Sequence, residues 1–295
     1  HIQARYDLTT RVVAIADRSS YLIEPTGLSQ TQVDTVLDTK TQGRSLSTLD
    51  GAQVGDAKAM LTEALGYRLA RPVFVDVSND DAAGAVFEHA FALGTDIVTA
   101  NKAPLSGTLA DYERVVAPAN QDRLLRAEST VGAGLPVLDT IQLLRATGDK
   151  VLSIQGCLSG TLGFIADALE SGSALSDAVE QAMGKGFTEP DPALDLSGAD
   201  VGRKALILAR ISGIAREAEA PDIEGFVPAS WIGLEVDELM SKIKTLDEIF
   251  AFRVAQATAA GECLRFVATV EPGMIDVGLK SVPKSSPLGS LTGTD

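Results

Sequence analysis

Between residues 11 and 130, short β-branched runs alternate with stretches that have helical spacing. The runs predicted to form strands are 11–17, 72–78, 96–100 and 124–128. The helical stretches, which hold little Gly or Pro, are 57–65, 82–93 and 109–117. Near-continuous apolar strands separated by helices predict a parallel sheet covered on both faces, the doubly wound, Rossmann-like α/β architecture of nucleotide-binding domains.

After the Gly-containing segment 131–134 the pattern changes. The predicted helices are 137–145, 162–170, 174–183, 199–211 and 246–259, and the predicted strands are 151–157, 263–270 and 274–280. Because strands no longer alternate strictly with helices, this part is expected to be a separate α+β domain. We therefore predict a nucleotide-binding domain of residues 1–135 and a second domain of residues 136–295.

Polar residues follow the predicted parallel strands, where α/β sheets bind their ligands. They are Asp17, Arg18, Ser78, Lys102 and Glu128. Asp17 would favour the free ribose hydroxyls of NAD, whereas Arg18 could receive the 2′-phosphate of NADP, so the choice of cofactor stays open. Residues 1–7 are expected to be the end of a helix, and the G-x-G-x-x-G turn that normally precedes it does not occur in the chain.

Residues 184–204 combine four carboxylates with three basic side chains. Pro190 and Pro192 are expected to keep the chain extended, which would place Glu189 on a stiff loop. Ser197 is the expected N-cap of the helix 199–211. On that helix Asp200 and Lys204 are four residues apart and so share one face.

Two interpretations of this acid and base remain. An exposed helical ion pair would contribute only about 0.3–0.5 kcal/mol and have no function. However, the same face continues into Leu208 and Ile211, and a lysine held beside carboxylates at a pocket wall can act as a general acid. Such a site suits a reaction that creates an alkoxide.

Composition excludes several classes of protein. The formal net charge of −15 over 295 residues opposes nucleic-acid binding. No apolar run is long enough to cross a membrane and no signal-peptide pattern occurs, so a cytoplasmic protein is expected. The two cysteines, Cys157 and Cys263, lack metal-ligand spacing and are expected to be buried thiols. With only His1 and His89, a Ser/His/Asp hydrolase or a His-dependent dehydrogenase is not expected.

Four segments carry a resemblance to a known family. They are Thr99-Ala100-Asn101-Lys102, residues 128–136, Ser159-Gly160-Thr161-Leu162, and residues 186–192 continuing through 200–204. In this order and spacing they resemble homoserine dehydrogenases, particularly the dehydrogenase half of fused aspartate kinase–homoserine dehydrogenases. The resemblance covers essentially the whole chain.

The resemblance implies NAD(P)-dependent interconversion of L-homoserine and L-aspartate 4-semialdehyde, a step of threonine, methionine and isoleucine biosynthesis. It implies that Lys204, Lys102 and Asp200 are catalytic. Lys204 would protonate the nascent alkoxide, and Lys102 would lie between cofactor and substrate. The implied substrate-binding residues are Glu189, Asp195, Asp200, Thr161 and Gly160. The implied cofactor-binding residues are Ser78, Lys102 and Gly186, together with Asp17 and Arg18.

The same resemblance implies a site for a monovalent cation, Na⁺ or K⁺, at Glu128 and the carbonyl groups of Val131, Ala133 and Leu135. It also implies a homodimer formed through the second, substrate-binding domain. The predicted strands 151–157 and 263–270 are expected at or near that interface, because apolar strands need a covering partner.

The chain departs from the family pattern in three places. The Gly-rich turn is absent, and Phe187 replaces a tyrosine that is common in the family. The sequence stops at residues 293–295, short of the segment that normally returns to the nucleotide domain. An alternative is therefore a truncated, non-catalytic homologue that keeps the substrate pocket and dimer surface but binds cofactor poorly. A pure binding or regulatory module is disfavoured, because the residues Lys102, Glu189, Asp200 and Lys204 are all retained.

Overall fold

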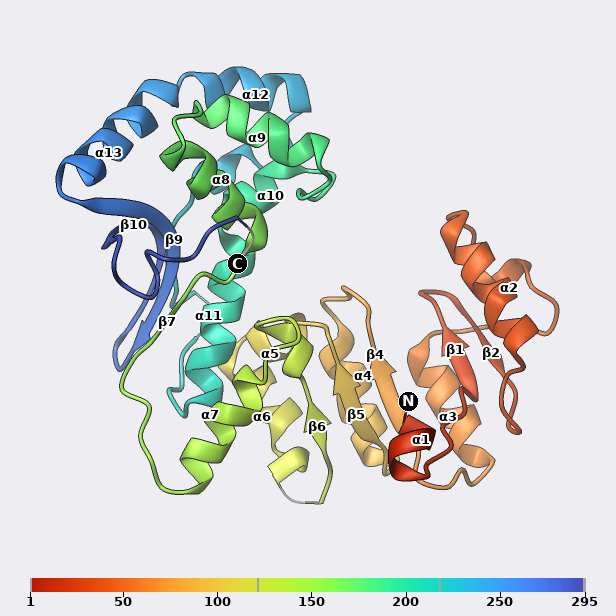
Figure 1. The fold of residues 1–295 in the computed structure, drawn as a ribbon. Coiled ribbons are helices and arrows are strands. Elements are labelled where there is room, and N and C mark those ends of the chain that lie inside the picture. The colour runs from red at the N-terminus through yellow and green to blue at the C-terminus, as the bar shows by residue number, and fades with distance from the viewer. Residues whose placement is uncertain (1, 121, 218, 294–295) are drawn as a thin grey trace. The chain divides into compact units, whose positions relative to one another are not determined.

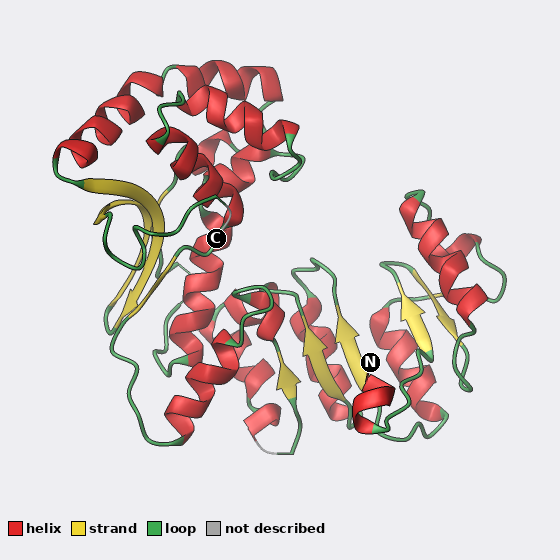
Figure 2. Cartoon of the chain, viewed as in Figure 1, coloured by secondary structure: helices red, strands yellow, loops and turns green. Residues whose placement is uncertain are grey.

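The computed structural model describes residues 2–120, 122–217 and 219–293 (Figure 1). Within them, contacts divide the chain into two compact units. One unit extends to Pro104 and includes Glu113–Arg126; the other comprises Leu105–Tyr112 and the chain from Ala127 onward. The α/β fold class is confirmed, and Figure 2 shows helices and strands throughout both units. No helix in the described part of the chain is long and apolar enough to cross a membrane.

The first unit contains the predicted parallel sheet. Its strands are β4 (Val73–Asp76), β5 (Asp96–Thr99) and β6 (Leu125–Arg126), in the order β4-β5-β6. The helices α4 (Ala83–Ala92), α5 (Ala103–Ser106) and α6 (Leu109–Val116) follow the strands in chain order.

Only one face of β4 is covered by the described residues. Phe74 packs edge-on against the buried Phe87 of α4, with ring centroids 6.2 Å apart. Val73 and Val75, which alternate with Phe74, are 53% and 58% exposed. The expectation of cover on both faces therefore fails at β4, because no described helix lies over this side.

The strand expected at 11–17 does not join the parallel sheet. β1 (Ala14–Ala16) pairs antiparallel with β2 (Ser20–Ile23), which pairs with β3 (Gln53–Val54). The carboxylate of Asp17 accepts hydrogen bonds from the N–H groups of Ser19 and Ser20, and this turn reverses the chain directly after β1. The helices of this region are α1 (Ile2–Tyr6), α2 (Gln30–Thr41) and α3 (Ala57–Gly66). His1 lies outside the described residues.

The second unit is built on a four-stranded sheet in the order β7-β9-β10-β8. Its strands are β7 (Ile154–Gly156), β8 (Asp222–Glu224), β9 (Glu262–Glu271) and β10 (Met274–Pro283). β9 and β10 form a long antiparallel hairpin, which Figure 1 shows as a curved ribbon, and β8 runs parallel to β10.

Seven α-helices in the described chain belong to this part of the sequence: α7 (Val137–Ala146), α8 (Gly160–Glu170), α9 (Leu175–Gly184), α10 (Pro192–Leu196), α11 (Ala199–Ile211), α12 (Val236–Lys244) and α13 (Asp247–Ala259). Of these, α8, α11 and α13 contact β9. Phe266 of β9 stacks on Phe226, with ring centroids 5.5 Å apart.

β9 is already buried in a single chain. All eight residues from Cys263 to Val270 are buried, although they alternate between the two faces of the strand. The reason given for placing strand 263–270 at a dimer interface, that its apolar residues need a partner, is therefore wrong. Residues of this same chain supply the cover.

Candidate functional site

Lys204 of α11 is held between two oxygen atoms. Its Nζ lies 2.9 Å from Oδ2 of Asp200 and donates a 2.6 Å hydrogen bond to the carbonyl oxygen of Leu158. The Lys204 side chain is 19% exposed and that of Asp200 is 41% exposed. Further along the same face Leu208 is buried, so the predicted transition from polar to apolar is confirmed. An ammonium has three N–H donors, and these contacts use two of them.

The start of α8 lies beside this lysine. Leu158 immediately precedes Ser159, whose hydroxyl accepts a hydrogen bond from the N–H of Leu162 and so caps α8. Sequence reasoning did not identify the carbonyl group of Leu158, because an acceptor from the main chain has no side-chain signature.

The loop between α9 and α10, residues 185–191, carries Glu189 and is called the carboxylate loop below. Asp195 closes this loop. Its Oδ2 accepts a 2.7 Å hydrogen bond from the backbone N–H of Glu189. Burial raises the pKa of Asp195 above its usual range, the hydrogen bond from Glu189 lowers it, and the negative charges of Glu189 and Asp200 add to the increase. The Glu189 side chain is exposed, and no hydrogen-bond donor among the described residues engages its carboxylate.

The loop is shorter than expected, because a helix begins at Pro192. Asp191 is the N-cap of α10 and accepts a 3.0 Å hydrogen bond from the N–H of Ala193. Proline suits the first helical position, where its fixed φ fits and no N–H is needed, so Pro192 starts a helix rather than preventing one.

The expected N-cap of α11 is also displaced by one residue. Gly198 occupies that position with φ +74°, and a Cβ there would lie 2.9 Å from Cζ of Phe266. Ser197 donates its hydroxyl to the carbonyl oxygen of Leu194, and the Oγ of Ser197 accepts a 3.3 Å hydrogen bond from the N–H of Ala199 at the start of α11. A turn that needs positive φ and close approach requires glycine, so α11 begins from Gly198.

Thr161 joins α8 to the carboxylate loop. Its Oγ1 donates a 2.6 Å hydrogen bond to the carbonyl oxygen of Phe187. The Phe187 ring packs edge-on against Phe164, and Nζ of Lys185 lies 4.5 Å from the centroid of the Phe164 ring. Gly186 has φ +70°, and no atom lies within 4 Å of a Cβ built there, so its surroundings are open.

Sequence reasoning missed Phe164 and Lys185 as members of this cluster. Phe164 follows Thr161 by three residues on α8, the spacing that brings side chains onto one helix face. That spacing was the available signal. The candidate substrate residues Gly160, Thr161, Glu189, Asp195, Asp200 and Lys204 thus all lie in the second unit, at the start of α8, in the α9–α10 loop and on α10 and α11.

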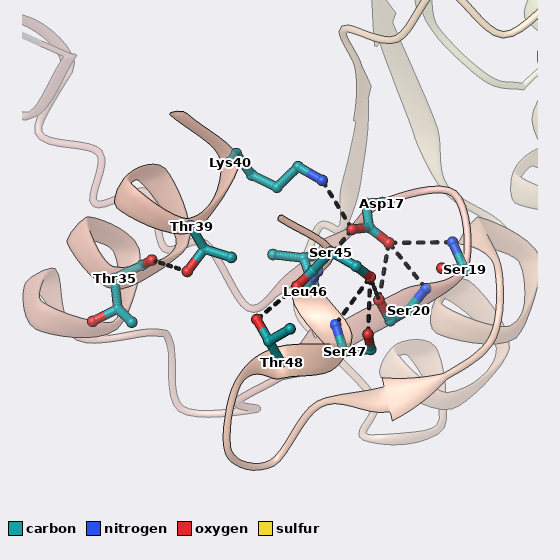
Figure 3. A network of polar contacts seen from close by, with 10 residues as sticks. All are labelled: Asp17, Ser19, Ser20, Thr35, Thr39, Lys40, Ser45, Leu46, Ser47 and Thr48. Atoms are coloured by element: carbon teal, nitrogen blue, oxygen red, sulfur yellow. Dashed lines mark hydrogen bonds and ion pairs between the residues drawn. The ribbon is translucent and has the colours of Figure 1, made fainter. Parts of the chain in front are cut away.

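In the first unit, the carboxylate of Asp17 is fully engaged (Figure 3). Oδ1 accepts hydrogen bonds from Ser19 and Ser20, while Oδ2 accepts one from the N–H of Leu46 at 2.8 Å and pairs with Nζ of Lys40 at 3.0 Å. Burial by itself raises the pKa of Asp17, but these hydrogen bonds, led by the one from Leu46, hold the pKa well below its usual range. Arg18, the next residue, is exposed.

The carboxyl ends of β4 and β5 are joined by Asn101. Its Nδ2 donates a 2.9 Å hydrogen bond to the carbonyl oxygen of Asp80, and its Oδ1 accepts one from the N–H of Ala103. Ser78 follows β4, and Lys102 follows Asn101. The sheet therefore brings Ser78 and Lys102 to the same edge, as parallel pairing requires.

The carboxylate of Glu128 caps α7. Its two oxygens accept hydrogen bonds from the N–H groups of Leu138 and Asp139, at 2.8 and 3.0 Å. A carboxylate has about four lone-pair sites, so it retains acceptor capacity. The loop between has Gly132 at φ +83° and Ala133 at φ +50°, and the carbonyl oxygen of Leu135 accepts the N–H of Val137.

Among the described residues, no group of three or more His, Cys, Asp or Glu side chains is arranged to hold a metal ion. Cys157 is half-buried and Cys263 is buried, and neither forms a disulfide. Burial raises the pKa of both thiols, so neither is a ready nucleophile.

A model of the homoserine dehydrogenase family matches residues 136–295. Over 288 residues the chain is 37% identical to a bifunctional aspartokinase/homoserine dehydrogenase of Haemophilus influenzae, covering 97% of this chain and 34% of that protein. It is 34% identical over 309 residues to a homoserine dehydrogenase of Emericella nidulans, covering 99% of this chain and 82% of that protein. The chain thus spans about a third of the length of the bifunctional relatives.

Solved structures with the same fold include a protein of unknown function from Candida auris, which is 28% identical with a TM-score of 0.82 and covers 98% of this chain and 81% of that one. They also include a hyperthermophilic archaeal homoserine dehydrogenase in complex with NADPH, 23% identical with a TM-score of 0.69, covering 97% of this chain and 78% of that one. At that identity the archaeal enzyme shows the shared fold alone.

Proposed function

The chain belongs to the homoserine dehydrogenase family, and from this premise we propose that it interconverts L-homoserine and L-aspartate 4-semialdehyde with a nicotinamide cofactor. The observation that carries the proposal is the arrangement of Lys204, held by Asp200 and the carbonyl oxygen of Leu158 with one N–H donor to spare. Reduction of an aldehyde creates an alkoxide, which a positioned ammonium can protonate.

When bound, a nicotinamide cofactor would supply the hydride for reduction and accept it in oxidation. Lys204 donates a proton to the substrate oxygen during reduction, and its neutral amine takes the hydroxyl proton during oxidation. Asp200 holds the Lys204 ammonium from the preceding helical turn. Lys102, at the edge of the parallel sheet, is assigned to the space between cofactor and substrate.

Glu189 is assigned to the ammonium group of the amino-acid substrate. Its exposed carboxylate has no donor among the described residues, so it remains available to a ligand. A charge-assisted hydrogen bond of this kind contributes about 1.5–3 kcal/mol. Asp195, Gly160 and Thr161 complete the proposed pocket, because they lie at the loop and helix start that adjoin Glu189 and Lys204.

For the cofactor we propose NADP rather than NAD. The Asp17 carboxylate, which would have to accept the ribose hydroxyls of NAD, is already engaged by five hydrogen bonds or ion-pair contacts inside the protein. Arg18 is exposed and can pair with a 2′-phosphate. Ser78 and Gly186 are the other proposed cofactor contacts, and no atom lies within 4 Å of a Cβ built at Gly186.

For the monovalent cation we propose Glu128 with the carbonyl oxygens of Val131, Ala133 and Leu135. Oxygen ligands suit hard cations. The positive φ angles of Gly132 and Ala133 keep this loop out of regular structure, so its carbonyl groups are not all used in a ladder. In this role Na⁺ or K⁺ would stabilise the loop and would take no part in the chemistry.

A homodimer remains part of the proposal, now supported by the second unit's uncovered apolar residues rather than by β9. Leu152, just before the edge strand β7, is 73% exposed, and Phe252 on α13 is 62% exposed. Light scattering at micromolar concentration would measure the mass. The role in threonine, methionine and isoleucine biosynthesis and the cytoplasmic location likewise remain proposals.

The decisive experiment is an assay of the full 295-residue chain with L-homoserine and NADP, followed by the nicotinamide absorbance, together with a titration of NADPH binding. Reduction of NADP that requires homoserine supports the proposal. Tight homoserine binding without cofactor binding or turnover would instead identify the chain as the non-catalytic homologue.

A further inference from the structure

Asp191 differs from the other three carboxylates of residues 184–204, because main-chain N–H groups donate hydrogen bonds to both of its oxygens. Oδ1 accepts the N–H of Ala193 at 3.0 Å, which caps α10. Oδ2 accepts the N–H of Gly233 at 2.9 Å, from a turn 42 residues further along the chain. One side chain therefore joins the carboxylate loop to a distant segment of the same unit.

That segment is itself anchored. Gly233 has φ +83°, a conformation that favours glycine, and it follows the short helix η4 (Ala229–Trp231). The ring of Trp231 lies 5.6 Å from Nζ of Lys242 on α12. At its other end, the N–H of Phe226 donates a 2.8 Å hydrogen bond to the carbonyl oxygen of Leu196. Residues 226–233 therefore form hydrogen bonds with both ends of α10, with the N-cap Asp191 at one end and with Leu196 at the other.

Two hydrogen bonds hold the backbone on and next to Glu189, one to Asp195 and one from Gly233 to Asp191. The N–H of Glu189 is held by Asp195 at 2.7 Å, and Glu189 is separated from Asp191 only by Pro190, whose φ is fixed. Its side chain is left exposed. A binding group that makes no contact of its own with the protein must be held in place through its backbone if it is to meet a substrate in one geometry.

We propose that Asp191 is a positioning residue: by latching the loop to Gly233 it fixes the backbone that presents Glu189 to the substrate. The inference rests on the proposed function for the identity of the substrate, homoserine. The latch itself is a property of the fold. This assignment gives Asp191 no contact with substrate or cofactor, and each of its oxygens accepts a hydrogen bond from the main chain.

The test uses Asp191→Asn in the full chain. Asparagine is also a good N-cap and can still accept the N–H of Ala193, but its amide nitrogen cannot accept the N–H of Gly233. We expect KM for L-homoserine to rise roughly tenfold, as for the loss of one hydrogen bond to a charged group, with kcat and the KM for NADP nearly unchanged. Asp56→Asn is the matched control, because Asp56 caps α3 in the other unit through the N–H of Ala59.

A double-mutant cycle tests whether Asp191 acts through Glu189. In a Glu189→Gln background, Asp191→Asn should add no further rise in the KM for homoserine, because the carboxylate it positions is gone. Additive effects would overturn the proposal. The proposal would also be overturned if Asp191→Asn lowered both kcat and the thermal midpoint of unfolding while Asp56→Asn lowered neither. That result would indicate a general structural role for Asp191.

Amide hydrogen exchange tests the hydrogen bond between Gly233 and Asp191, the latch, independently of enzyme activity. Asp191→Asn should accelerate exchange at Gly233, while Asp56→Asn should leave it unchanged. If the parent chain does not oxidise homoserine, the proposed function fails, but the exchange rate at Gly233 still decides whether the latch exists. An active parent in which Asp191→Asn alters neither Gly233 exchange nor the KM for homoserine would refute the latch alone.

Discussion

The backbone N–H of Glu189 donates a 2.7 Å hydrogen bond to the carboxylate of Asp195, six residues further along the chain. This contact places a half-buried carboxyl group next to an exposed one, with Asp200 also close enough to influence its charge. Asp195 is therefore expected to contribute to the pH dependence of stability as well as to the proposed pocket.

The stability of the Asp195→Asn variant relative to the parent should increase as pH rises. Burial raises the folded-state pKa of Asp195, so the stability it contributes is present below the unfolded-state pKa of about 4 and is lost as pH rises through the folded value. Thermal midpoints at pH 4 and pH 7 should show the variant gaining on the parent at the higher pH. The exposed Asp177→Asn on α9 is the control, and a gain of equal size there would contradict the assignment.

Lys204→Ala should abolish most turnover and leave NADP affinity intact. A general acid is worth about 10²–10⁴-fold in rate, so kcat should fall within that range. Steady-state kinetics measure this, with the adjacent, exposed Arg203→Ala as a control for loss of positive charge on α11. A fall of less than about tenfold would exclude the proton-transfer role.

Glu189→Gln should weaken homoserine binding by roughly 10–100-fold, because the shape is kept while the charge that pairs with the ammonium is lost. The thermal midpoint and the affinity for NADP should stay close to the parent, since the side chain is exposed. Isothermal titration measures both affinities, and the exposed Glu180→Gln on α9 serves as the control. Early unfolding with unchanged substrate affinity would make Glu189 structural.

Arg18→Ala should raise the KM for NADP by about tenfold or more and change the KM for NAD little, because only NADP carries the 2′-phosphate. The ratio of kcat/KM for the two cofactors is the measurement. Arg203→Ala, in the other unit, removes the same charge and should leave that ratio unaltered. Equal losses with both cofactors would count against Arg18 as the phosphate contact.

Gly198→Ala should destabilise the second unit by more than about 1 kcal/mol, because φ +74° disfavours a side chain and the new Cβ would lie 2.9 Å from Phe266. Gly184→Ala, in a helix with no atom near its Cβ position, should be neutral or stabilising. Urea unfolding compares the two variants. Equal stability would show that α11 can start without a glycine.

Sequence periodicity predicted α11 to the residue at both ends, and with it the Asp200–Lys204 pair, because both depend only on spacing along one helix. It did not predict α2. Only Val33, Val36 and Leu37 are apolar among its 12 residues, so its apolar stripe is short, although Ser29 and Gln32 form a capping box that signals its start.

Long-range contacts explain the remaining differences. Asp17 was a candidate for the cofactor ribose, but its partner Leu46 lies 29 residues away, and no local pattern indicates that this N–H turns the carboxylate inward. The link from Asp191 to Gly233 spans 42 residues and was equally invisible. Local rules describe which groups are available, whereas tertiary contacts decide which of them remain available to a ligand.

The uninterrupted burial of β9 has a consequence for measuring motion in this protein. A strand shielded at eight consecutive residues loses its amide protection only when the unit around it unfolds, so its exchange rates report the global stability of the second unit. The α9–α10 loop has no such shield. Amides there that exchange faster than those of β9 would therefore reveal openings of the loop that leave the hairpin intact. The ratio of the unprotected exchange rate to the observed rate at each loop amide would give the free energy of those openings.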